Sequence, residues 1–184
     1  MAHKLAVFIS TVTVVAWAQV ASAQTWAAAG FVGTVDESDT SMHVFGSNGA
    51  VAIKSSASGT LNIRYEVERM LGQFSSPDDC TELRANLRDT GAGARVIVRL
   101  MRLGLGGETP VGELAVLGEI DSDAPPTGAS NRYVTYRSCL TTDGPGFLSE
   151  NAYFVDVQLI KTSATANPGL MSLQICPSQD FCDP

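Results

Sequence analysis

The sequence contains little charge, few aromatic side chains and almost no histidine. Charged residues make up 17% of the 184 residues and aromatic residues 7%, while apolar residues reach 45%. This balance excludes a disordered chain and a coiled coil, which carry far more charge. The formal net charge of −7 repels phosphate groups and anionic lipids, so neither a nucleic acid nor a membrane surface is an expected partner.

Motifs for catalysis and for zinc are absent as well. The sequence has no GxSxG elbow and no CxxC pair, which argues against an α/β-hydrolase and against a cysteine-rich zinc site. Beyond the first 23 residues His43 is the only histidine, and Ser47 follows it within Gly-Ser-Asn-Gly. That tetrapeptide is typical of a hairpin turn. We therefore predict no catalytic residue.

The apolar run near the N-terminus is too short to cross a bilayer. It covers residues 5–18, about 14 residues against the roughly 20 that a spanning helix needs. Lys4 precedes the run and Ala21-Ser22-Ala23 follows it, which is the layout of a secretory signal peptide. The sequence predicts a Sec-type signal peptide over 1–23 and a single domain over 24–184. The protein is then secreted or periplasmic, with no membrane span after processing.

All four cysteines follow this leader, in a compartment where an even number usually forms disulfides. They are Cys80, Cys139, Cys176 and Cys182. Three pairings are possible. The short loop between Cys176 and Cys182 closes at little entropic cost, which favours Cys176–Cys182 together with Cys80–Cys139.

Apolar and polar residues alternate with a period of two along much of the chain, as in strands with one dry face. The clearest segments are 61–68, 94–100 and 153–159. Weaker strands are expected at 31–35, 43–45, 51–54, 83–88, 113–117, 132–138 and 170–176. Clusters of Gly, Asn, Asp and Pro separate them. We predict an all-β fold, a single antiparallel β-sandwich of jelly-roll type with about 8–10 strands, stapled by disulfides.

The segment before Gly91 has two interpretations. Ser76-Pro77-Asp78-Asp79 could begin a helix that runs toward Arg88. Alternatively, residues 83–88 and 94–99 form a hairpin across the turn 89–93, with the alternate apolar residues inside. That register places Arg84, Arg88, Arg95 and Arg99 on one wet face, with Arg88 opposite Arg95 and Arg84 opposite Arg99.

Five segments resemble a family of small exported bacterial proteins with no established activity. They are TLNIRYEV (60–67), LRDTGAGARVIVRL (87–100), EIDSDAPP (119–126), ENAYFVDVQL (150–159) and NPGLMSLQIC (167–176). The resemblance implies a compact β-sandwich and a hairpin rather than a helix around residue 89. It also implies that Cys80, Cys139 and Cys176 are recurring positions.

Calcium is the cofactor for which the sequence offers candidate ligands, because exported sandwiches meet calcium and acidic loops can wrap it. Asp36 and Asp39 lie in one acidic loop, and Asp121 and Asp123 lie in another. Neither loop has the spacing of an EF-hand. Carboxylates that only face solvent in a surface loop would give the same sequence pattern as calcium ligands.

The expected function is binding, to a glycan or a surface polymer, without catalysis. The candidate ligand-binding residues are Arg84, Arg88, Arg95, Arg99 and Phe154, the last as a ring on a wet strand face. The arginines are structural if Glu66, Glu68 or Asp156 neutralises them, and form an anion or acidic-polysaccharide site if they are unpaired. One alternative is a polysaccharide-active enzyme that uses Glu66 with Glu68 or Asp156. Another is a self-assembling fibre subunit, for which an unpaired edge strand would be the mark.

Overall fold

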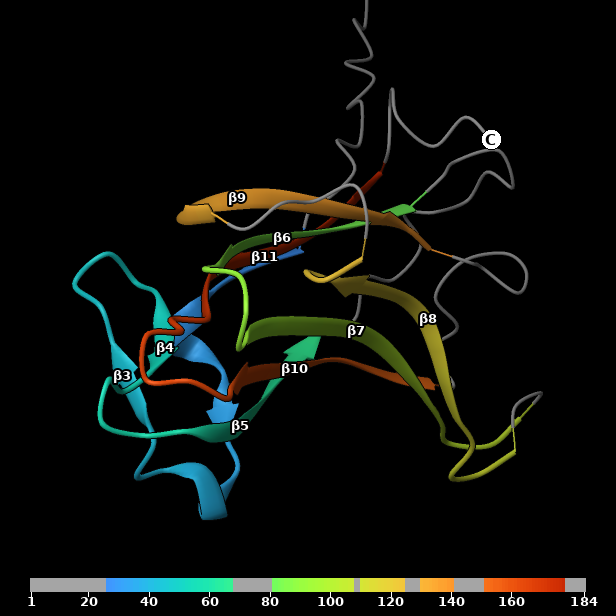
Figure 1. The fold of residues 1–184 in the computed structure, drawn as a ribbon. Coiled ribbons are helices and arrows are strands. Elements are labelled where there is room, and N and C mark those ends of the chain that lie inside the picture. Colours follow the sequence, from blue (N-terminus) through green and yellow to red (C-terminus); the bar gives the residue numbers. More distant parts are fainter. Residues whose placement is uncertain (1–25, 68–80, 108–109, 125–129, 141–150, 178–184) are drawn as a thin grey trace, which may run out of the picture.

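The computed structural model describes residues 26–67, 81–107, 110–124, 130–140 and 151–177, which lie almost entirely in strands (Figure 1). The strands are β1 Trp26–Ala29, β2 Thr34–Val35, β3 His43–Phe45, β4 Val51–Ile53, β5 Gly59–Val67, β6 Thr81–Asp89, β7 Ala94–Gly104, β8 Leu114–Asp121, β9 Ser130–Cys139, β10 Asn151–Lys161 and β11 Gly169–Pro177. Two 3-10 helices, η1 Gly30–Val32 and η2 Glu37–Asp39, follow β1 and β2. Within the described ranges no helix has the length and apolar character of a membrane span.

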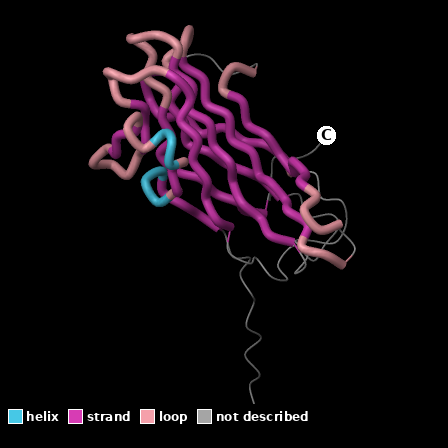
Figure 2. The backbone as a smooth tube through the Cα atoms, turned by 90° about the horizontal axis from the view of Figure 1, so that it is seen from below, coloured by secondary structure: helices cyan, strands magenta, loops and turns pink. Residues whose placement is uncertain are grey.

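The strands form two antiparallel sheets that pack face to face. Sheet 1 has the order β3-β4-β11-β6-β9, with β1 also paired to β11, and sheet 2 has the order β2-β5-β10-β7-β8. Figure 1 shows β9, β6 and β11 as one layer above β7, β10 and β5, and Figure 2 shows the long strands running lengthwise through the body. The eight strands β4 to β11 have the jelly-roll arrangement, 4-11-6-9 on 5-10-7-8. The predicted all-β antiparallel sandwich is confirmed.

The period-two pattern explains the core. On each long strand the alternate apolar residues point between the sheets: Leu61, Ile63 and Tyr65 of β5, Val96, Val98 and Leu100 of β7, and Val155, Val157 and Leu159 of β10 are all at most 3% exposed. Leu83, Ala85 and Leu87 of β6 face them from sheet 1 and are equally buried. The predicted inward faces of all these strands are confirmed.

The predicted hairpin of β6 with β7 is wrong. β6 pairs with β11 and β9 in sheet 1, whereas β7 pairs with β10 and β8 in sheet 2, so the turn 90–93 crosses between the sheets. The alternation of apolar and polar residues determines which side chains of a strand are buried, but not which strand it pairs with. A connection that crosses from one sheet to the other, called an arch, buries the same side chains as a hairpin would. The four arginines therefore lie on the outer faces of two different sheets. The alternative helix toward Arg88 is also wrong from residue 81 onward, because β6 occupies that segment.

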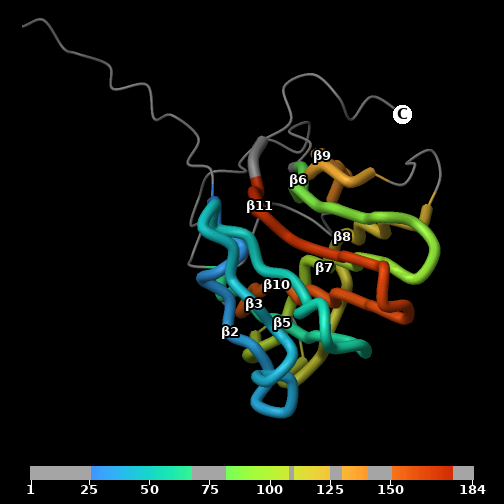
Figure 3. The backbone as a smooth tube through the Cα atoms, turned by 60° about the vertical axis from the view of Figure 1, so that its left-hand side comes forward, coloured from blue at the N-terminus to red at the C-terminus, as the bar shows by residue number. Residues whose placement is uncertain are grey.

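The first strand begins earlier than predicted. The expected strand at 31–35 is interrupted by η1, and only Thr34 and Val35 pair with β5. Gly30, where η1 begins, packs directly on the backbone of β11, and an added Cβ would lie 2.2 Å from the Leu170 carbonyl oxygen. The buried Tyr65 hydroxyl donates to the Gly30 carbonyl oxygen at 2.6 Å. This first part of the chain closes one side of the sandwich (Figure 3).

Two cysteine positions lie on either side of Glu82, which pairs with Cys139 of β9 on one side and Cys176 of β11 on the other. Two strand spacings separate their backbones by about 9–10 Å, whereas a disulfide needs Cα atoms within roughly 7 Å. The register therefore excludes a Cys139–Cys176 bond. Cys80 and Cys182 lie outside the described residues, so Cys80–Cys139 and Cys176–Cys182 stay predictions, as does the signal peptide over 1–23.

Candidate functional site

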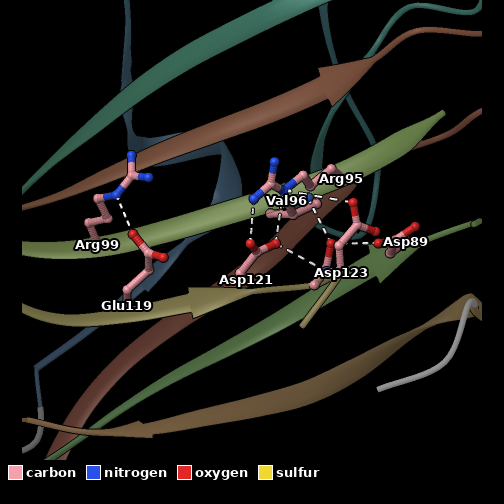
Figure 4. Close-up of polar contacts among 8 residues, drawn as sticks. Asp89, Arg95, Val96, Arg99, Glu119, Asp121 and Asp123 are labelled. Atoms are coloured by element: carbon pink, nitrogen blue, oxygen red, sulfur yellow. Dashed lines mark hydrogen bonds and ion pairs between the residues drawn. The ribbon is translucent and has the colours of Figure 1, made fainter. Parts of the chain in front are cut away.

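Arg95 and Arg99 of β7 are each paired with a carboxylate from β8 (Figure 4). Arg95 donates from Nε and Nη2 to the two carboxylate oxygens of Asp121, and Arg99 Nε donates to Glu119 Oε2 at 2.6 Å. The hydrogen bond from Arg95 holds the pKa of Asp121 below its ordinary value. The charges of Arg95 and Arg99 are thus neutralised by carboxylates of β8. We had expected Glu66, Glu68 or Asp156 to neutralise them.

Arg84 of β6 is also paired. Its Nη2 lies 2.9 Å from Glu82 Oε2, and Arg137 Nε of β9 lies 3.5 Å from Glu82 Oε1. Glu82 is 1% exposed, so a buried carboxylate satisfies two cations on the outer face of sheet 1. Arg84 is structural by this criterion.

Arg88 differs from the other three predicted arginines. Its Nε donates to the Asn167 carbonyl oxygen at 3.1 Å and its Nη2 to Asn167 Oδ1 at 2.7 Å. The guanidinium lies 4.9 Å from the centroid of the Tyr133 ring. Within the described ranges no carboxylate forms an ion pair with it. Because a guanidinium has five N–H donors, three remain for a further acceptor.

Arg88 lines a pocket of about 430 Å³ on the outer face of sheet 1, beside the β3–β4 edge. Its lining residues come from the β3–β4 hairpin and the residues around it, from Arg88 and Tyr133, and from the end of β10 and the loop that follows it. The other polar lining residues are Asn48, Ser55, Lys161, Thr165 and Asn167. None of the described lining residues is Asp or Glu.

Lys161 is the second cation of this pocket. It is the last residue of β10 and occupies a core-facing position, 1% exposed. Its Nζ donates to the carbonyl oxygens of Lys54 and Ser55, both at 2.9 Å. In the described part of the chain it has no carboxylate partner. Lysine is almost never fully buried unless it is paired with an opposite charge, and the partners of Lys161 are two backbone carbonyl oxygens.

A glycine lies beside Arg88 and Tyr133 on the outer face of sheet 1. In the register of sheet 1, Gly169 of β11 lies between Ala52 of β4 and Arg88 of β6. A Cβ on Gly169 would lie 2.8 Å from the Tyr133 hydroxyl oxygen, so glycine allows the tyrosine to extend over the sheet. Burial raises the pKa of Tyr133, with Arg88 opposing. The neutral hydroxyl, for which the described residues offer no hydrogen-bond partner, is thus available to a ligand.

The predicted calcium loops hold their carboxylates in protein contacts. Asp36 accepts from Ser38, and Asp39 Oδ2 accepts from the backbone and side-chain amides of Asn62, both at 2.9 Å. Asp121 and Asp123 lie beside Arg95. No group of three or more His, Cys, Asp or Glu side chains in the described ranges is arranged to hold a metal ion. Calcium binding by these loops stays a prediction.

The remaining candidates lie away from the pocket. Phe154 is on the outer face of sheet 2, where its ring contacts the Arg64 guanidinium at 4.5 Å. Asp156 lies 3.9 Å from Arg64, and exposed Glu66 is opposite Phe154. Glu68 falls outside the described residues. Neither Glu66 nor Asp156 lines the pocket beside Arg88, and the enzyme alternative stays a prediction. His43 packs on Phe45, with the ring centroids 4.7 Å apart.

Sequence reasoning identified Arg88 but missed Lys161, Tyr133 and Asn167. One signal was available for Lys161, because the alternation that buries Val155, Val157 and Leu159 continues to position 161. A lysine in a core register is a buried charge that needs an explanation. Tyr133 and Asn167 carried no such signal, because the pairing of their segments with β6 was not known.

No family model and no curated protein matches the sequence. Solved structures of similar fold include a family 35 carbohydrate-binding module from Clostridium thermocellum, at 11% identity, with 83% of this chain and 98% of that chain covered and a TM-score of 0.36. A family 11 carbohydrate-binding module from the same organism was solved in complex with a β-1,3-1,4-mixed-linked tetrasaccharide. It has 12% identity and a TM-score of 0.37, with 86% of this chain and 90% of that chain covered.

A family two carbohydrate esterase from Cellvibrio japonicus gives 11% identity, 88% of this chain and a TM-score of 0.39. The chain spans only 36% of the esterase's length. None of these likenesses carries the activity of the similar protein to this chain.

Proposed function

We propose that this protein is an exported, noncatalytic binding protein whose pocket on sheet 1 holds an acidic sugar. The observation that supports this most is the pair of cations, Arg88 and Lys161, that line one pocket without a carboxylate among the described lining residues. Three other arginines of this acidic protein are each matched to a carboxylate. Arg88 and Lys161 thus have no paired carboxylate among the described residues, unlike these three arginines.

The rest of the lining favours a sugar over a simple inorganic anion. Amide and hydroxyl groups of Asn48, Ser55, Thr165 and Asn167 surround the two cations, and such groups can pair with several ligand hydroxyls at once. A pocket of about 430 Å³ is within the usual range for small-molecule sites. A carboxylate on the sugar would accept from Arg88 in a charge-assisted hydrogen bond.

Calorimetric titration of the mature protein tests the proposal. The probes are di- and trisaccharides of galacturonate and of glucuronate, each with its carboxyl-reduced neutral counterpart. We expect an acidic probe to bind and its neutral counterpart to bind at least about ten-fold more weakly, because a hydrogen bond to a charged group contributes roughly 1.5–3 kcal/mol. Equal affinity for both, or binding of neither, would rule the proposal out.

A matched pair of arginine variants tests whether the sugar binds at this pocket. Arg88→Gln removes the charge at the pocket, whereas Arg132→Gln removes one from the exposed part of β9 that does not line it. We expect the first to abolish discrimination between acidic and neutral probes and the second to retain it. A thermal melt of each variant shows whether the fold is intact.

A further inference from the structure

The outer face of sheet 2 carries a row of alternating charges. The register of the four central strands aligns Arg64 of β5, Asp156 of β10, Arg99 of β7 and Glu119 of β8. Arg64 and Asp156 lie 3.9 Å apart, and Arg99 and Glu119 lie 2.6 Å apart. We call these four residues the charge row; its β7–β8 half is visible in Figure 4.

Apolar side chains occupy most of the two rows next to it, toward the β7–β8 turn, with Glu66 of β5 at the end of the first row. Phe154, Met101 and Val116 align in one row, and Ala152, Leu103 and Leu114 align in the next. Val116 is 50% exposed and Leu114 is 58% exposed. Beyond them Leu105 and Val111 are 56% and 80% exposed. A run of apolar residues on an outward sheet face is a mark of an interaction surface.

We infer that this face is the interface between two copies of the chain, related by a two-fold axis parallel to the strands. That rotation reverses the strand order, so β5 faces β8 of the partner and β10 faces β7. In the charge row Arg64 then faces a glutamate and Asp156 faces an arginine, so that every charge meets one of opposite sign. An isologous contact requires this kind of self-complementarity.

The central pairs of the two apolar rows match under the same rotation, whereas Glu66 at the end of the first row faces Val116 of the other copy. Phe154 of one copy lies over Met101 of the other, and Ala152 lies over Leu103. Two stacked sheets of this kind pack with a crossing angle of about 30°, which keeps facing rows near each other. The pattern of the face thus favours a second copy of the chain as the partner, because the rotation sets each charge of the row against its opposite.

The size of the face is sufficient for a weak dimer. Four strands spaced about 4.8 Å apart and nine residues at about 3.4 Å each give roughly 590 Å² per copy. The total of about 1,200 Å² lies at the lower end of specific interfaces. The dimer should therefore be concentration-dependent and weakened by salt, because the charge row is exposed at its ends.

The pocket remains open in this dimer because it lies on sheet 1, whose outer face points away from the contact. Two pockets then face opposite directions on one particle. If the ligand is repeated along a polymer, the second binding event becomes intramolecular and the apparent affinity rises.

Sedimentation equilibrium of the mature protein tests the dimer, with Val116→Arg as the disrupting variant. Thr135→Arg is its control, since Thr135 is also an exposed strand residue but lies on the other sheet. We expect a reversible dimer for the wild type and the control, and dimerisation at least about ten-fold weaker for Val116→Arg. A wild type that stays monomeric into the millimolar range, or a dimer indifferent to Val116→Arg, would overturn the inference.

Inverting the charge row tests the geometry. The variant carries Arg64→Asp, Asp156→Arg, Arg99→Asp and Glu119→Arg, which preserves the alternation within one chain. We expect it to form its own dimer but no mixed dimer with the wild type, since all facing charges would then be alike. Mixed dimers at the statistical ratio, measured with one partner labelled, would contradict the proposed axis. Neither result depends on the sugar ligand.

Discussion

Ser122→Ala should destabilise the domain strongly, although it removes a single oxygen atom. Ser122 is 3% exposed and follows β8. Its hydroxyl donates to Asp89 Oδ2 at the end of β6 and accepts from the Val96 backbone N–H of β7 at 2.8 Å. One hydroxyl thus connects the ends of strands in both sheets, at the arch that the sequence pattern did not reveal.

The expected loss of stability follows from the two buried groups that would lose a hydrogen-bond partner in Ser122→Ala. The buried Val96 N–H would lose its acceptor, and Asp89, 3% exposed, would keep the Gly91 N–H at 2.8 Å but lose the hydroxyl. An orphaned buried group costs about 1–3 kcal/mol, and more when it is charged, so we expect a loss of about 2–4 kcal/mol. In a domain of this size each kcal/mol lowers the Tm by roughly 2–4 °C.

Urea denaturation measures this loss, with Ser38→Ala as the control. Ser38 also bonds a carboxylate, Asp36, at 2.8 Å, but in an exposed turn, so its removal should cost within about 0.5 kcal/mol. A loss below about 1 kcal/mol for Ser122→Ala, or equal losses for the two variants, would refute the view that this hydroxyl ties the sheets together.

Three further predictions concern the pocket, the response to acid and the cysteines. Gly169→Ala should displace Tyr133 and weaken sugar binding with only a small loss of stability. Unchanged affinity by calorimetry would contradict the role of Gly169 in placing Tyr133 at the pocket. The pKa of Asp121 is lowered by Arg95, so its stabilisation is present above the ordinary value near 4 and is lost as the pH falls below it. Asp121→Asn should therefore flatten the acid limb of stability against pH in denaturation curves, and a steeper limb would show the sign to be wrong. Nonreducing peptide mapping should recover Cys80–Cys139 and Cys176–Cys182, and a Cys139–Cys176 peptide would be incompatible with the sheet 1 register.

The sequence predicted the strands well because burial leaves a local trace. The core-facing residues of β5, β7 and β10 could be read one by one, and the bounds of most strands agree to within a few residues. Strand partners leave no such trace: β6 and β7 are joined by a four-residue turn, yet they belong to different sheets. A hairpin and an arch bury the same alternate residues, so periodicity could not distinguish them.

The candidate site depended on those partners and was therefore predicted only in part. Arg88 was identified with three arginines that prove to be paired, because carboxylates such as Glu82 and Glu119 become neighbours only through sheet pairing. Lys161 could have been noticed as a lysine in a core register. Tyr133 approaches Arg88 from β9, which is distant in sequence, so no local pattern could have joined them.

Mapping the ligand onto the structure by amide chemical shifts is the most direct test of the binding site. The mature, isotope-labelled protein is titrated with the acidic trisaccharide that binds best by calorimetry, under conditions where it is monomeric. We expect the largest shifts at Ala52, Tyr133 and residues 165–167 around the pocket, and little change at Arg99 or Val116 on sheet 2. Shifts concentrated on the outer face of sheet 2, with the pocket residues unmoved, would contradict the assignment of the pocket as the sugar site.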